Sequence, residues 1–184
     1  MDIVVESDPD DPTRGRVCWL DRSGLARSAP CALGRSGIVA EERKREGDGA
    51  TPAGRFPLRR VLWRADREAS PKTSLPARAI EETDGWCDDP ARPEYNRPVT
   101  FPSYFFGTAE RLWRDDHLYD VVVVLGHNDD PPTPGLGSAI FLHVAKPDFG
   151  PTEGCIAMAR DDLRALLERI APGDALVVRS PGDD

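Results

Sequence analysis

The sequence predicts a mainly β protein with a few helices, and three features carry this expectation. Short runs of β-branched and apolar residues recur along the 184-residue chain, each bounded by turn-forming residues. The 18 prolines and 16 glycines supply many loops and interrupt longer regular elements. Only one stretch has the apolar spacing of a convincing helix. At this length we expect a single domain, residues 1–184.

The clearest expected strand lies within residues 120–125. This segment ends in the run Val-Val-Val-Val-Leu, which is typical of a strand covered on both faces. Residues 139–143 form a second apolar run and would bring a histidine to a strand end. We expect these two strands to pair across the loop 128–138. The other principal strands are expected at residues 3–5, 16–20, 56–63 and 175–178.

One helix is expected near the C-terminal end of the chain. Its apolar face has the spacing of a single helical stripe and comprises Leu163, Leu166, Leu167 and Ile170. Asp161 stands at the start of this stretch, and the Pro-Gly pair at 172–173 stops it. Because the helix follows Cys155 closely, its apolar face would fasten the turn that carries this cysteine to the core.

Charge and hydropathy argue against two classes of partner. The formal net charge is -8, and the arginines are scattered among acidic residues, whereas binding to nucleic acid needs a clustered basic surface. The basic run 41–46 is balanced by its own glutamates and predicts a solvated loop or short helix face, although Arg43, Lys44 or Arg45 could instead hold a substrate carboxylate. No apolar run approaches the roughly 20 residues of a membrane helix. We expect a monomer that binds no nucleic acid and does not span a membrane.

The four cysteines form no recognisable framework. Cys18, Cys31, Cys87 and Cys155 lie far apart and include no Cys-x-x-Cys pair, which weakens the zinc-ribbon, thioredoxin and disulfide interpretations. Cys18 and Cys31 are expected to be small buried hydrophobic residues. Cys87 is either a structural cysteine or part of the wall of a cleft.

A histidine and a cysteine carry the clearest chemical signal. His143 ends an apolar run, and Cys155 follows Gly154 in the stretch Gly-Pro-Thr-Glu-Gly-Cys-Ile-Ala-Met. A cysteine attacks carbonyls as the thiolate, and since a free thiol has a pKa of roughly 8.5, an imidazole that accepts its proton is the usual activating group. Gly154 leaves the backbone beside the sulfur uncrowded, so that a substrate carbonyl can approach. These residues predict a nucleophile, Cys155, and a general base, His143.

This stretch resembles the signature of the L,D-transpeptidase (YkuD-like) catalytic domain family, in which a histidine precedes a Ser/Thr-x-Gly-Cys-Ile/Val core. Residues 152–156, Thr-Glu-Gly-Cys-Ile, fit that core. The resemblance to small single-domain members extends over most of the chain, with further similar segments at residues 47–56, 86–96 and 119–143. One departure is Ala157, where the family often has an arginine whose role Arg160 or Lys146 would have to supply.

The resemblance implies a β-sandwich of mixed sheets with the catalytic cysteine in a cleft, and it implies a mechanism. His143 would take the thiol proton, and Cys155 would attack a peptide carbonyl to form an acyl-enzyme thioester that an amine resolves. Backbone N–H groups at Gly154 and Cys155 would form the oxyanion hole. The group that orients the imidazole is not apparent, because a backbone carbonyl can serve as well as a carboxylate; Ser138 and Gly137 are candidates.

The resemblance also implies the partners and the location. The substrates would be peptidoglycan stem peptides, with the third-position diamino acid, the first-position L-alanine or a free D-amino acid as acceptor. Carbapenem-type inhibitors would acylate the cysteine, and no cofactor or metal is expected. The location would be the bacterial periplasm or cell wall. The first residues are acidic and lack the basic and apolar regions of a signal peptide, so we expect either a mature form or unconventional export.

Two polar stretches are expected to bind substrate, each with a plainer alternative. Trp86, Asp88 and Asp89 could form a cleft wall in which a carboxylate holds the ammonium of a diamino acid, or the two acids could simply form a turn before a proline. His127 and Asn128 end a strand and could approach the catalytic histidine, or they could belong to a loop with Asx-type turns.

Three residues of the motif and one glycine-rich segment complete the expected site. Gly154 is expected to shape the catalytic turn, while Thr152 and Ala157, which flank the cysteine, are expected to line the substrate site. Residues 49–54, Gly-Ala-Thr-Pro-Ala-Gly, predict a rigid turn with a structural role.

Three alternative functions remain open. A peptidoglycan hydrolase of the L,D-carboxypeptidase or amidase type would use the same site and let water resolve the thioester. A zinc peptidase would use His117, His127 and His143 with nearby aspartates, although their spacing matches no known zinc motif. A non-catalytic wall-binding module would not depend on the cysteine for chemistry.

Overall fold

The structure is a computed structural model that describes residues 1–101 and 107–180. As predicted, it is mainly β, and within the described residues it has one α-helix. In chain order the elements are β1 (Asp2–Ser7), β2 (Arg14–Leu20), β3 (Ala26–Ala32), β4 (Ile38–Val39), the 3-10 turn η1 (Glu41–Arg43), β5 (Thr51–Pro52), β6 (Gly54–Trp63), β7 (Ala77–Ala79), β8 (Asp84–Cys87), β9 (Pro98–Thr100), β10 (Ala109–Arg111), β11 (Val121–Leu125), β12 (Phe141–Val144), β13 (Ile156–Met158), α1 (Arg160–Leu167) and β14 (Ala175–Val178). That residues 1–184 form one domain stays a prediction.

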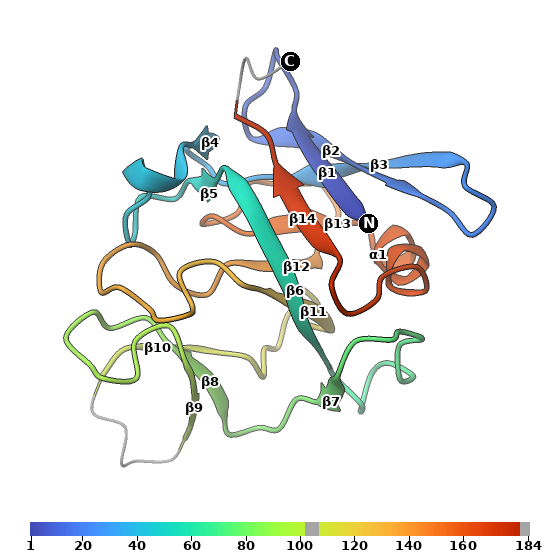
Figure 1. Ribbon diagram of the computed structural model, residues 1–184. Helices are drawn as coiled ribbons and strands as arrows, with labels where there is room; N and C mark the ends of the chain where they lie inside the picture. Colours follow the sequence, from blue (N-terminus) through green and yellow to red (C-terminus); the bar gives the residue numbers. More distant parts are fainter. Residues whose placement is uncertain (102–106, 181–184) are drawn as a thin grey trace.

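One large mixed sheet organises the molecule. Its strand order is β11-β12-β13-β3-β2-β1-β14-β6-β7, with parallel pairs β12–β13, β1–β14 and β6–β7 among antiparallel ones. Because β11 also pairs with β6, the sheet closes on itself. A smaller sheet, β10-β8-β9, lies below the closed sheet in Figure 1, and β4 pairs with β5. The expected mixed-sheet arrangement is therefore confirmed.

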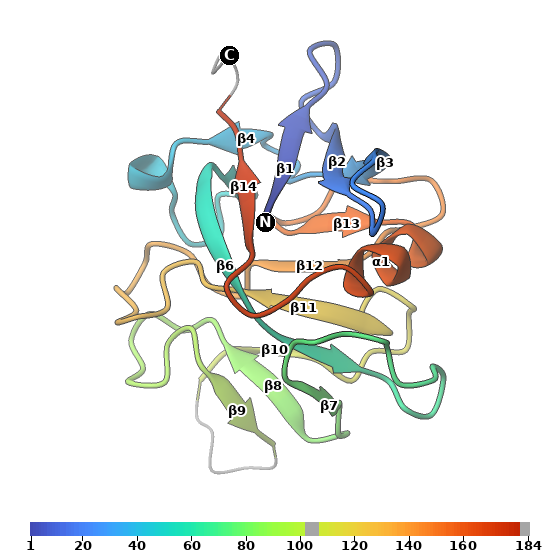
Figure 2. The same cartoon turned by 45° about the vertical axis from the view of Figure 1, so that its right-hand side comes forward.

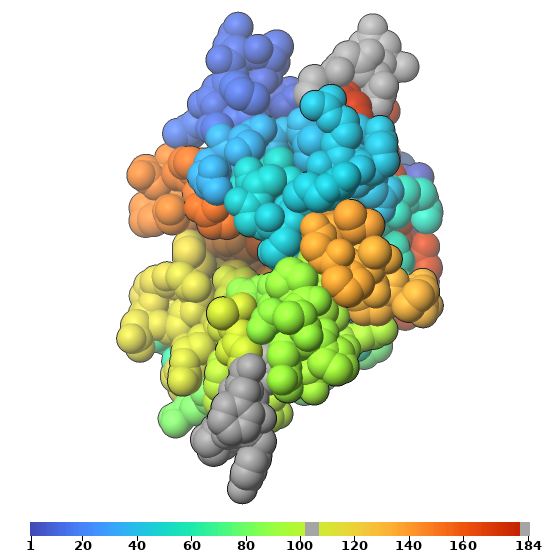
Figure 3. Space-filling model, turned by 90° about the vertical axis from the view of Figure 1, so that its left-hand side faces the viewer, coloured from blue at the N-terminus to red at the C-terminus, as the bar shows by residue number. Residues whose placement is uncertain are grey.

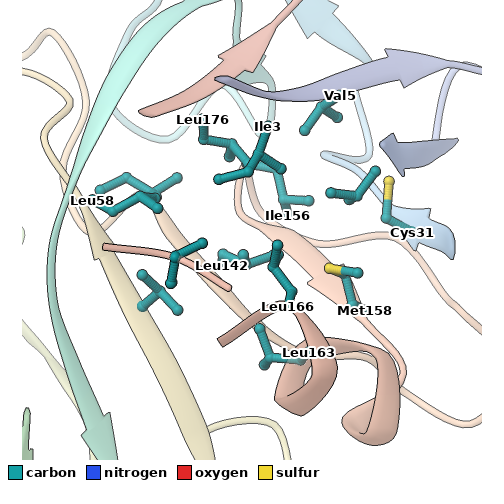
Figure 4. Close-up of a cluster of buried hydrophobic side chains, with 14 of the residues drawn as sticks. Ile3, Val5, Cys31, Leu58, Leu142, Ile156, Met158, Leu163, Leu166 and Leu176 are labelled. Atoms are coloured by element: carbon teal, nitrogen blue, oxygen red, sulfur yellow. The ribbon is translucent and has the colours of Figure 1, made fainter. Parts of the chain in front are cut away.

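The main hydrophobic core fills the interior of the closed sheet, and α1 covers one side of it (Figure 2). All four residues of the predicted helical face, Leu163, Leu166, Leu167 and Ile170, are buried. The helix is shorter than predicted, because α1 ends at Leu167 and Ile170 lies beyond it. Figure 4 shows Leu163 and Leu166 directed from α1 toward Leu142 and Met158. Truncating one such leucine to alanine costs roughly 2–5 kcal/mol. Since α1 follows β13 directly, this burial anchors the segment that carries Cys155.

The predicted pairing of the two apolar runs is confirmed. β11 and β12 are antiparallel, with Val122 opposite His143 and Val124 opposite Phe141. Every residue of β11 and of β12 is buried. His143 is the second-last residue of β12, close to the strand end expected from sequence.

Several strands carry no clear sequence signal. β3 contains arginine, serine and proline, and β8 begins Asp-Gly, so neither shows the apolar alternation of a strand. Both form because neighbouring strands supply hydrogen-bond partners: β3 pairs with β2 and β13, and β8 pairs with β9 and β10. Tertiary contacts here override local propensity.

The predictions for Cys18, Cys31 and Cys87 have different outcomes. Cys31 and Cys87 are buried free thiols, in line with the structural interpretation of both. The prediction for Cys18 is wrong, because this residue is only partly buried. In β2 the buried residues alternate with Arg16, Cys18 and Leu20, so Cys18 lies on the outer face.

A second cluster of buried side chains joins the small sheet to the closed sheet. It includes Trp86, Tyr119, Phe141 and Cys155. The Trp86 and Phe141 rings meet edge to face, with centroids 5.2 Å apart. Across residues 1–101 and 107–180, no helix has the length and apolar character needed to cross a membrane.

Candidate active site

A hydrogen-bonded turn just before β13 presents Cys155. The Thr152 hydroxyl donates to the carbonyl of Cys155 (2.6 Å) and accepts a hydrogen bond from the Gly154 amide (3.1 Å). The buried Thr51 hydroxyl reaches the same carbonyl (3.5 Å) and accepts from the Gly34 amide (2.9 Å). Thr152 lines the cleft, as expected, but its hydroxyl is engaged in building the turn. Thr51 gives the Thr-Pro-x-Gly segment the structural role that the sequence predicts.

Gly154 is required by two features of its backbone. Its φ angle is +133°, a region that L side chains rarely adopt. A Cβ at this position would lie 2.8 Å from the carbonyl oxygen of Ala50. The glycine therefore lets the segment that carries Ala50 lie directly against the Cys155 turn.

The Cys155 thiol is buried and protonated in the free protein. It donates to the Ala139 carbonyl (3.2 Å) and accepts a hydrogen bond from the Phe141 amide (3.4 Å). Burial, together with the Glu110 carboxylate, raises the pKa of the thiol to about 12, and the Phe141 amide and the Lys44 ammonium offset only part of this increase. The thiolate must therefore form during reaction instead of existing at rest.

His143 is a buried, neutral imidazole. Its Nδ1 lies 2.8 Å from the Val144 carbonyl, and since a carbonyl only accepts, Nδ1 carries the proton and Nε2 the basic lone pair. Burial lowers the pKa of His143 to about 4. The Tyr119 ring packs against it edge to face, with centroids 5.2 Å apart. The orienting group is thus the Val144 carbonyl, and the suggestion of Ser138 or Gly137 is wrong.

Strand pairing brings His143 and Cys155 to one cleft. In the parallel β12–β13 pair, His143 stands beside Ala157, two residues after Cys155. Side chains two residues apart in an extended chain project from the same face. Cys155, Ala157 and His143 all line a cleft of about 610 Å³. Because the thiol is hydrogen-bonded to Ala139, it must turn away from that carbonyl to reach His143.

The cleft wall is strongly charged and rich in carboxylates. Segments far apart in sequence surround a recess on the face shown in Figure 3. The charged residues that line it are Lys44, Glu46, Asp88, Glu110, Arg114, Asp116, Lys146 and Glu153. The hydroxyls of Tyr95 and Tyr119 donate to Glu46 and Glu110, which fixes both acids. Burial raises the pKa of Glu110, and the charges of Asp88 and Glu46 raise it further.

Sequence reasoning did not find Arg114. For Lys44 the preferred interpretation, a solvated residue, is wrong, whereas the alternative put this residue in the substrate site, and it does line the cleft. Lys44 lies in a run predicted to be solvated, yet it is only 2% exposed and pairs with Asp48; the four-residue Lys-Asp spacing was the one local signal. The Arg114 carbonyl accepts from the buried Arg64 (2.6 Å), and its guanidinium is held by both oxygens of Asp116 (2.9 and 2.6 Å). Nothing near Arg114 in sequence points to the cleft.

The residue that departs from the family pattern lies at the floor of the cleft. Ala157 is 1% exposed and adjoins His143, so it lines the site as expected. Arg160, suggested as a substitute cation, instead pairs with Glu68 and Asp120 and does not line the cleft. That suggestion is wrong, whereas Lys146 does line the cleft.

Of the aromatic and acidic residues Trp86, Asp88 and Asp89, two have structural roles and one lines the cleft. Trp86 does not line the cleft: its ring is buried, and its Nε1 donates to Asn96 Oδ1 (2.8 Å). Asp89 accepts a hydrogen bond from the Ala91 amide (3.0 Å), the simple turn that was the alternative. Asp88 does line the cleft, and its Oδ1 is buried with no hydrogen-bond partner among the described residues. Only Asp88 of these three is placed to contact substrate.

His127 and Asn128 lie away from the cleft. Val122 pairs with His143, whereas His127 lies five residues beyond Val122, past the end of β11 at Leu125, and neither His127 nor Asn128 lines the cleft. Its Nε2 lies 3.1 Å from the Leu136 carbonyl. Asn128 closes the 128–137 loop through Thr133 and Gly137. The expected approach of these residues to His143 is wrong, and the plain-loop interpretation holds.

The histidines proposed for a zinc site are dispersed. His117 contacts Asp120, His127 contacts Leu136, and His143 contacts Val144. Throughout residues 1–101 and 107–180, no group of three His, Cys, Asp or Glu side chains is placed to hold a metal ion. The ligand set of the zinc-peptidase alternative is therefore not assembled.

Fold and site together define a closed mixed β-sheet with a cysteine and a histidine in one carboxylate-rich cleft. The model of the L,D-transpeptidase catalytic domain family (YkuD) matches residues 4–178, so the chain belongs to this family. Among solved structures it matches L,D-transpeptidase 1 of Mycobacterium tuberculosis at 14% identity and a TM-score of 0.38. The match covers 96% of this chain and 60% of that one. No curated protein matches.

Proposed function

We propose that this protein is a cysteine-dependent L,D-transpeptidase that transfers acyl groups between peptidoglycan stem peptides at the bacterial cell wall. The observation that carries the proposal is the placement of Cys155 and His143 in one cleft by the parallel strands β12 and β13, in a chain of the L,D-transpeptidase family. No other cysteine lines that cleft among the described residues.

In the proposed reaction, proton transfer and attack occur together. His143 Nε2 accepts the thiol proton as the Cys155 sulfur bonds to the substrate carbonyl carbon, giving a tetrahedral oxyanion. The carbon–nitrogen bond then breaks, and the imidazolium returns the proton to the departing amine, leaving a thioester. An acceptor amine attacks the thioester, gives a proton to His143, and displaces the Cys155 thiolate, which is reprotonated.

The pKa values explain why the two groups must act in concert. A thiol pKa of about 12 and an imidazole pKa of about 4 make a resting thiolate–imidazolium pair unfavourable. Transfer becomes favourable only when the negative charge passes to a stabilised oxyanion. The Gly154 amide already donates to Thr152, so the Cys155 amide is the better of the two donors expected for the oxyanion.

We further propose that Asp88 binds a cationic group of the substrate. A buried carboxylate oxygen without a donor is costly, and an ammonium would supply the missing hydrogen bond. Glu110 of β10 pairs with Trp86 of β8. Asp88 is two residues after Trp86, so Asp88 and Glu110 are diagonal neighbours on the same face of the small sheet. The diamino acid of a stem peptide carries such an ammonium.

The deciding experiment is mass spectrometry of disaccharide-tetrapeptide fragments incubated with the wild type and with Cys155→Ala. Dimers that depend on Cys155 support the proposal, and their fragmentation shows whether the third-position diamino acid is the acceptor. The first-position L-alanine has a free amine only in a tetrapeptide released from the sugar, so its use as acceptor is tested by adding that free tetrapeptide. Exchange of the terminal residue in the presence of a free D-amino acid reveals the third acceptor class. Trimmed monomers without dimers indicate the L,D-carboxypeptidase alternative. If no product depends on Cys155, both the transpeptidase and the L,D-carboxypeptidase are rejected, and the non-catalytic wall-binding module remains.

Substrate contact is tested separately by Asp88→Asn with Asp89→Asn as the control. Charge-assisted hydrogen bonds contribute about 1.5–3 kcal/mol, so Asp88→Asn should raise KM roughly ten-fold for stem peptides with a diamino acid. Peptides with an uncharged analogue at that position should be unaffected. Equal effects of the two variants would reject the Asp88 assignment.

Reaction with a carbapenem provides an independent test of the nucleophile. The ring carbonyl should acylate Cys155 in the wild type and add the mass of the inhibitor to the peptide that contains this residue. An adduct on any other cysteine, or none at all, would argue against an activated thiol in this cleft.

A further inference from the structure

Asn96 is a buried amide whose hydrogen-bonding capacity is fully used. Its Oδ1 accepts from Trp86 Nε1 (2.8 Å) and from the Ala139 amide (3.1 Å). Its Nδ2 donates to the carbonyls of His127 (3.0 Å) and Asn128 (2.7 Å). The residue is 4% exposed and has a φ angle of +53°. One side chain thus connects β8, the turn after β11 and the segment before β12.

The segment before β12 controls the surroundings of the nucleophile. Ala139 has a φ angle of +52°, which is unfavourable for a non-glycine residue and requires support from its neighbours. Its amide is held by Asn96, and its carbonyl accepts the Cys155 thiol proton (3.2 Å). Two residues later, the Phe141 amide donates to the same sulfur (3.4 Å). Phe141 is held by the pairing of β12 with β11, so of the two groups that hold the sulfur only the Ala139 carbonyl depends on Asn96.

We propose that Asn96 is a positioning residue for Cys155. By holding the Ala139 amide, it fixes the Ala139 carbonyl that accepts the thiol hydrogen bond, and so determines how far the sulfur must move to reach His143. Asn96 itself contacts neither the sulfur nor the imidazole. Its effect on turnover rests on the proposed function, whereas its effect on the reactivity of the thiol does not.

Two consequences distinguish positioning from simple stabilisation. Without Asn96, the Ala139 carbonyl is no longer held toward the sulfur, so the protonated thiol loses an acceptor and its pKa falls. The Cys155 thiol should then react faster with iodoacetamide near neutral pH. Turnover should fall all the same, because the sulfur no longer occupies one defined place before His143.

The chain offers a matched control in Asn128. This residue is also an asparagine with positive φ (+45°), and its side chain makes three hydrogen bonds, to Thr133 and Gly137. None of these bonds reaches Ala139. Asn96→Ala and Asn128→Ala therefore impose a similar backbone penalty and remove four and three side-chain hydrogen bonds. The two residues touch only through the Asn128 carbonyl, which the control substitution leaves in place.

The experiment measures Tm, the pH profile of Cys155 alkylation and kcat against KM for both variants. We expect both to lower Tm, but only Asn96→Ala to move the alkylation profile to lower pH and to reduce kcat at least ten-fold with KM nearly unchanged. Identical alkylation profiles for Asn96→Ala and the wild type would overturn the proposal, even if Tm falls.

A second pair covers the case in which Asn96→Ala does not fold. Asn96→Asp keeps the volume and the acceptor for Ala139 but loses both donors, and Asn128→Asp makes the same change at the control position. Because Asp retains the acceptor that holds the Ala139 amide, the proposal expects Asn96→Asp to keep the wild-type alkylation profile and the same kcat as Asn128→Asp. A clearly lower kcat or a shifted profile for Asn96→Asp would show that the donors act instead, and would overturn the proposal. If the wild type itself shows no turnover, the proposed function fails, and the alkylation profiles still decide the role of Asn96.

Discussion

Two histidines of this protein have a similar local sequence context, but only one of them lines the Cys155 cleft. His127 and His143 each follow an apolar β run, both are at most 4% exposed, and burial lowers the pKa of each to about 4. Yet His143 lines the Cys155 cleft, whereas His127 packs edge to face on Phe56, with ring centroids 5.4 Å apart.

Their hydrogen bonds also select opposite tautomers. The Val144 carbonyl requires the proton on Nδ1 of His143, and the Leu136 carbonyl requires it on Nε2 of His127. Burial and pKa therefore do not identify a general base. What distinguishes His143 is the neighbouring strand β13, which places a cysteine on the same face of the sheet.

The largest expected effect comes from replacing each of the two histidines with glutamine and comparing the loss of kcat. General-base catalysis contributes about 10²–10⁴-fold, so His143→Gln should reduce kcat by at least about 100-fold in the fragment assay. His127→Gln should stay within a few-fold of the wild type while lowering Tm, because the loop loses a buried contact. Comparable losses of kcat in the two variants would remove the distinction.

The turn that brings Cys155 beside His143 can be disrupted at Gly154. An alanine there meets the Ala50 carbonyl at 2.8 Å and adopts φ +133°, so Gly154→Ala should cost roughly 4 kcal/mol from backbone strain and overpacking together. Gly24 also has positive φ but has open space around it, so Gly24→Ala should cost only about 1 kcal/mol. Urea denaturation measures both. Equal costs would show that contact with Ala50 is unimportant.

The pH dependence of stability should contain a contribution from each histidine. Burial lowers both pKa values from 6.5 to about 4, so as pH falls the unfolded chain binds these protons before the folded protein does. Stability is therefore complete above pH 6.5 and declines as pH falls toward 4, by about 3 kcal/mol per histidine. His127→Gln should remove about half of this slope. An unchanged slope would show that His127 is not buried as a neutral ring.

The smallest effect should come from Phe56→Leu, which removes the aromatic contact of His127 alone. The Phe56 ring packs against His127 and helps to exclude water from it. Because burial is the main cause of the lowered His127 pKa, a smaller side chain should let this pKa move toward 6.5, while that of His143 does not change. NMR titration of the two ring signals measures both. A joint shift would mean that the two sites are coupled, against the separation seen here.

The part of the site that sequence predicted is the part encoded locally. Cys155 and Gly154 are adjacent, and the turn that presents them depends on Thr152, three residues before the cysteine. The same holds for the α1 stripe and for β11, whose periodicity follows from the faces they bury. These elements were predictable because the residues that determine them are close in sequence.

The cleft walls were not predictable, since their members meet only after the sheet closes. Lys44 and Arg114 reach the Cys155 cleft from segments about 40 residues or more away; no local pattern marks Arg114, and Lys44 is marked only by its four-residue spacing to Asp48. Strands such as β3 and β8 form only because their neighbours offer hydrogen-bond partners.

By itself, the sequence determined a β-rich chain, one amphipathic helix and a cysteine–histidine pair, because side-chain periodicity and a short motif are local properties. The tertiary structure decided which of two similar histidines stands beside Cys155, which carboxylate lines the cleft, and that Asn96 supports the residue on which the thiol rests. Strand register makes these choices: antiparallel β11–β12 places His127 far from His143, and parallel β12–β13 places His143 beside the Cys155 segment.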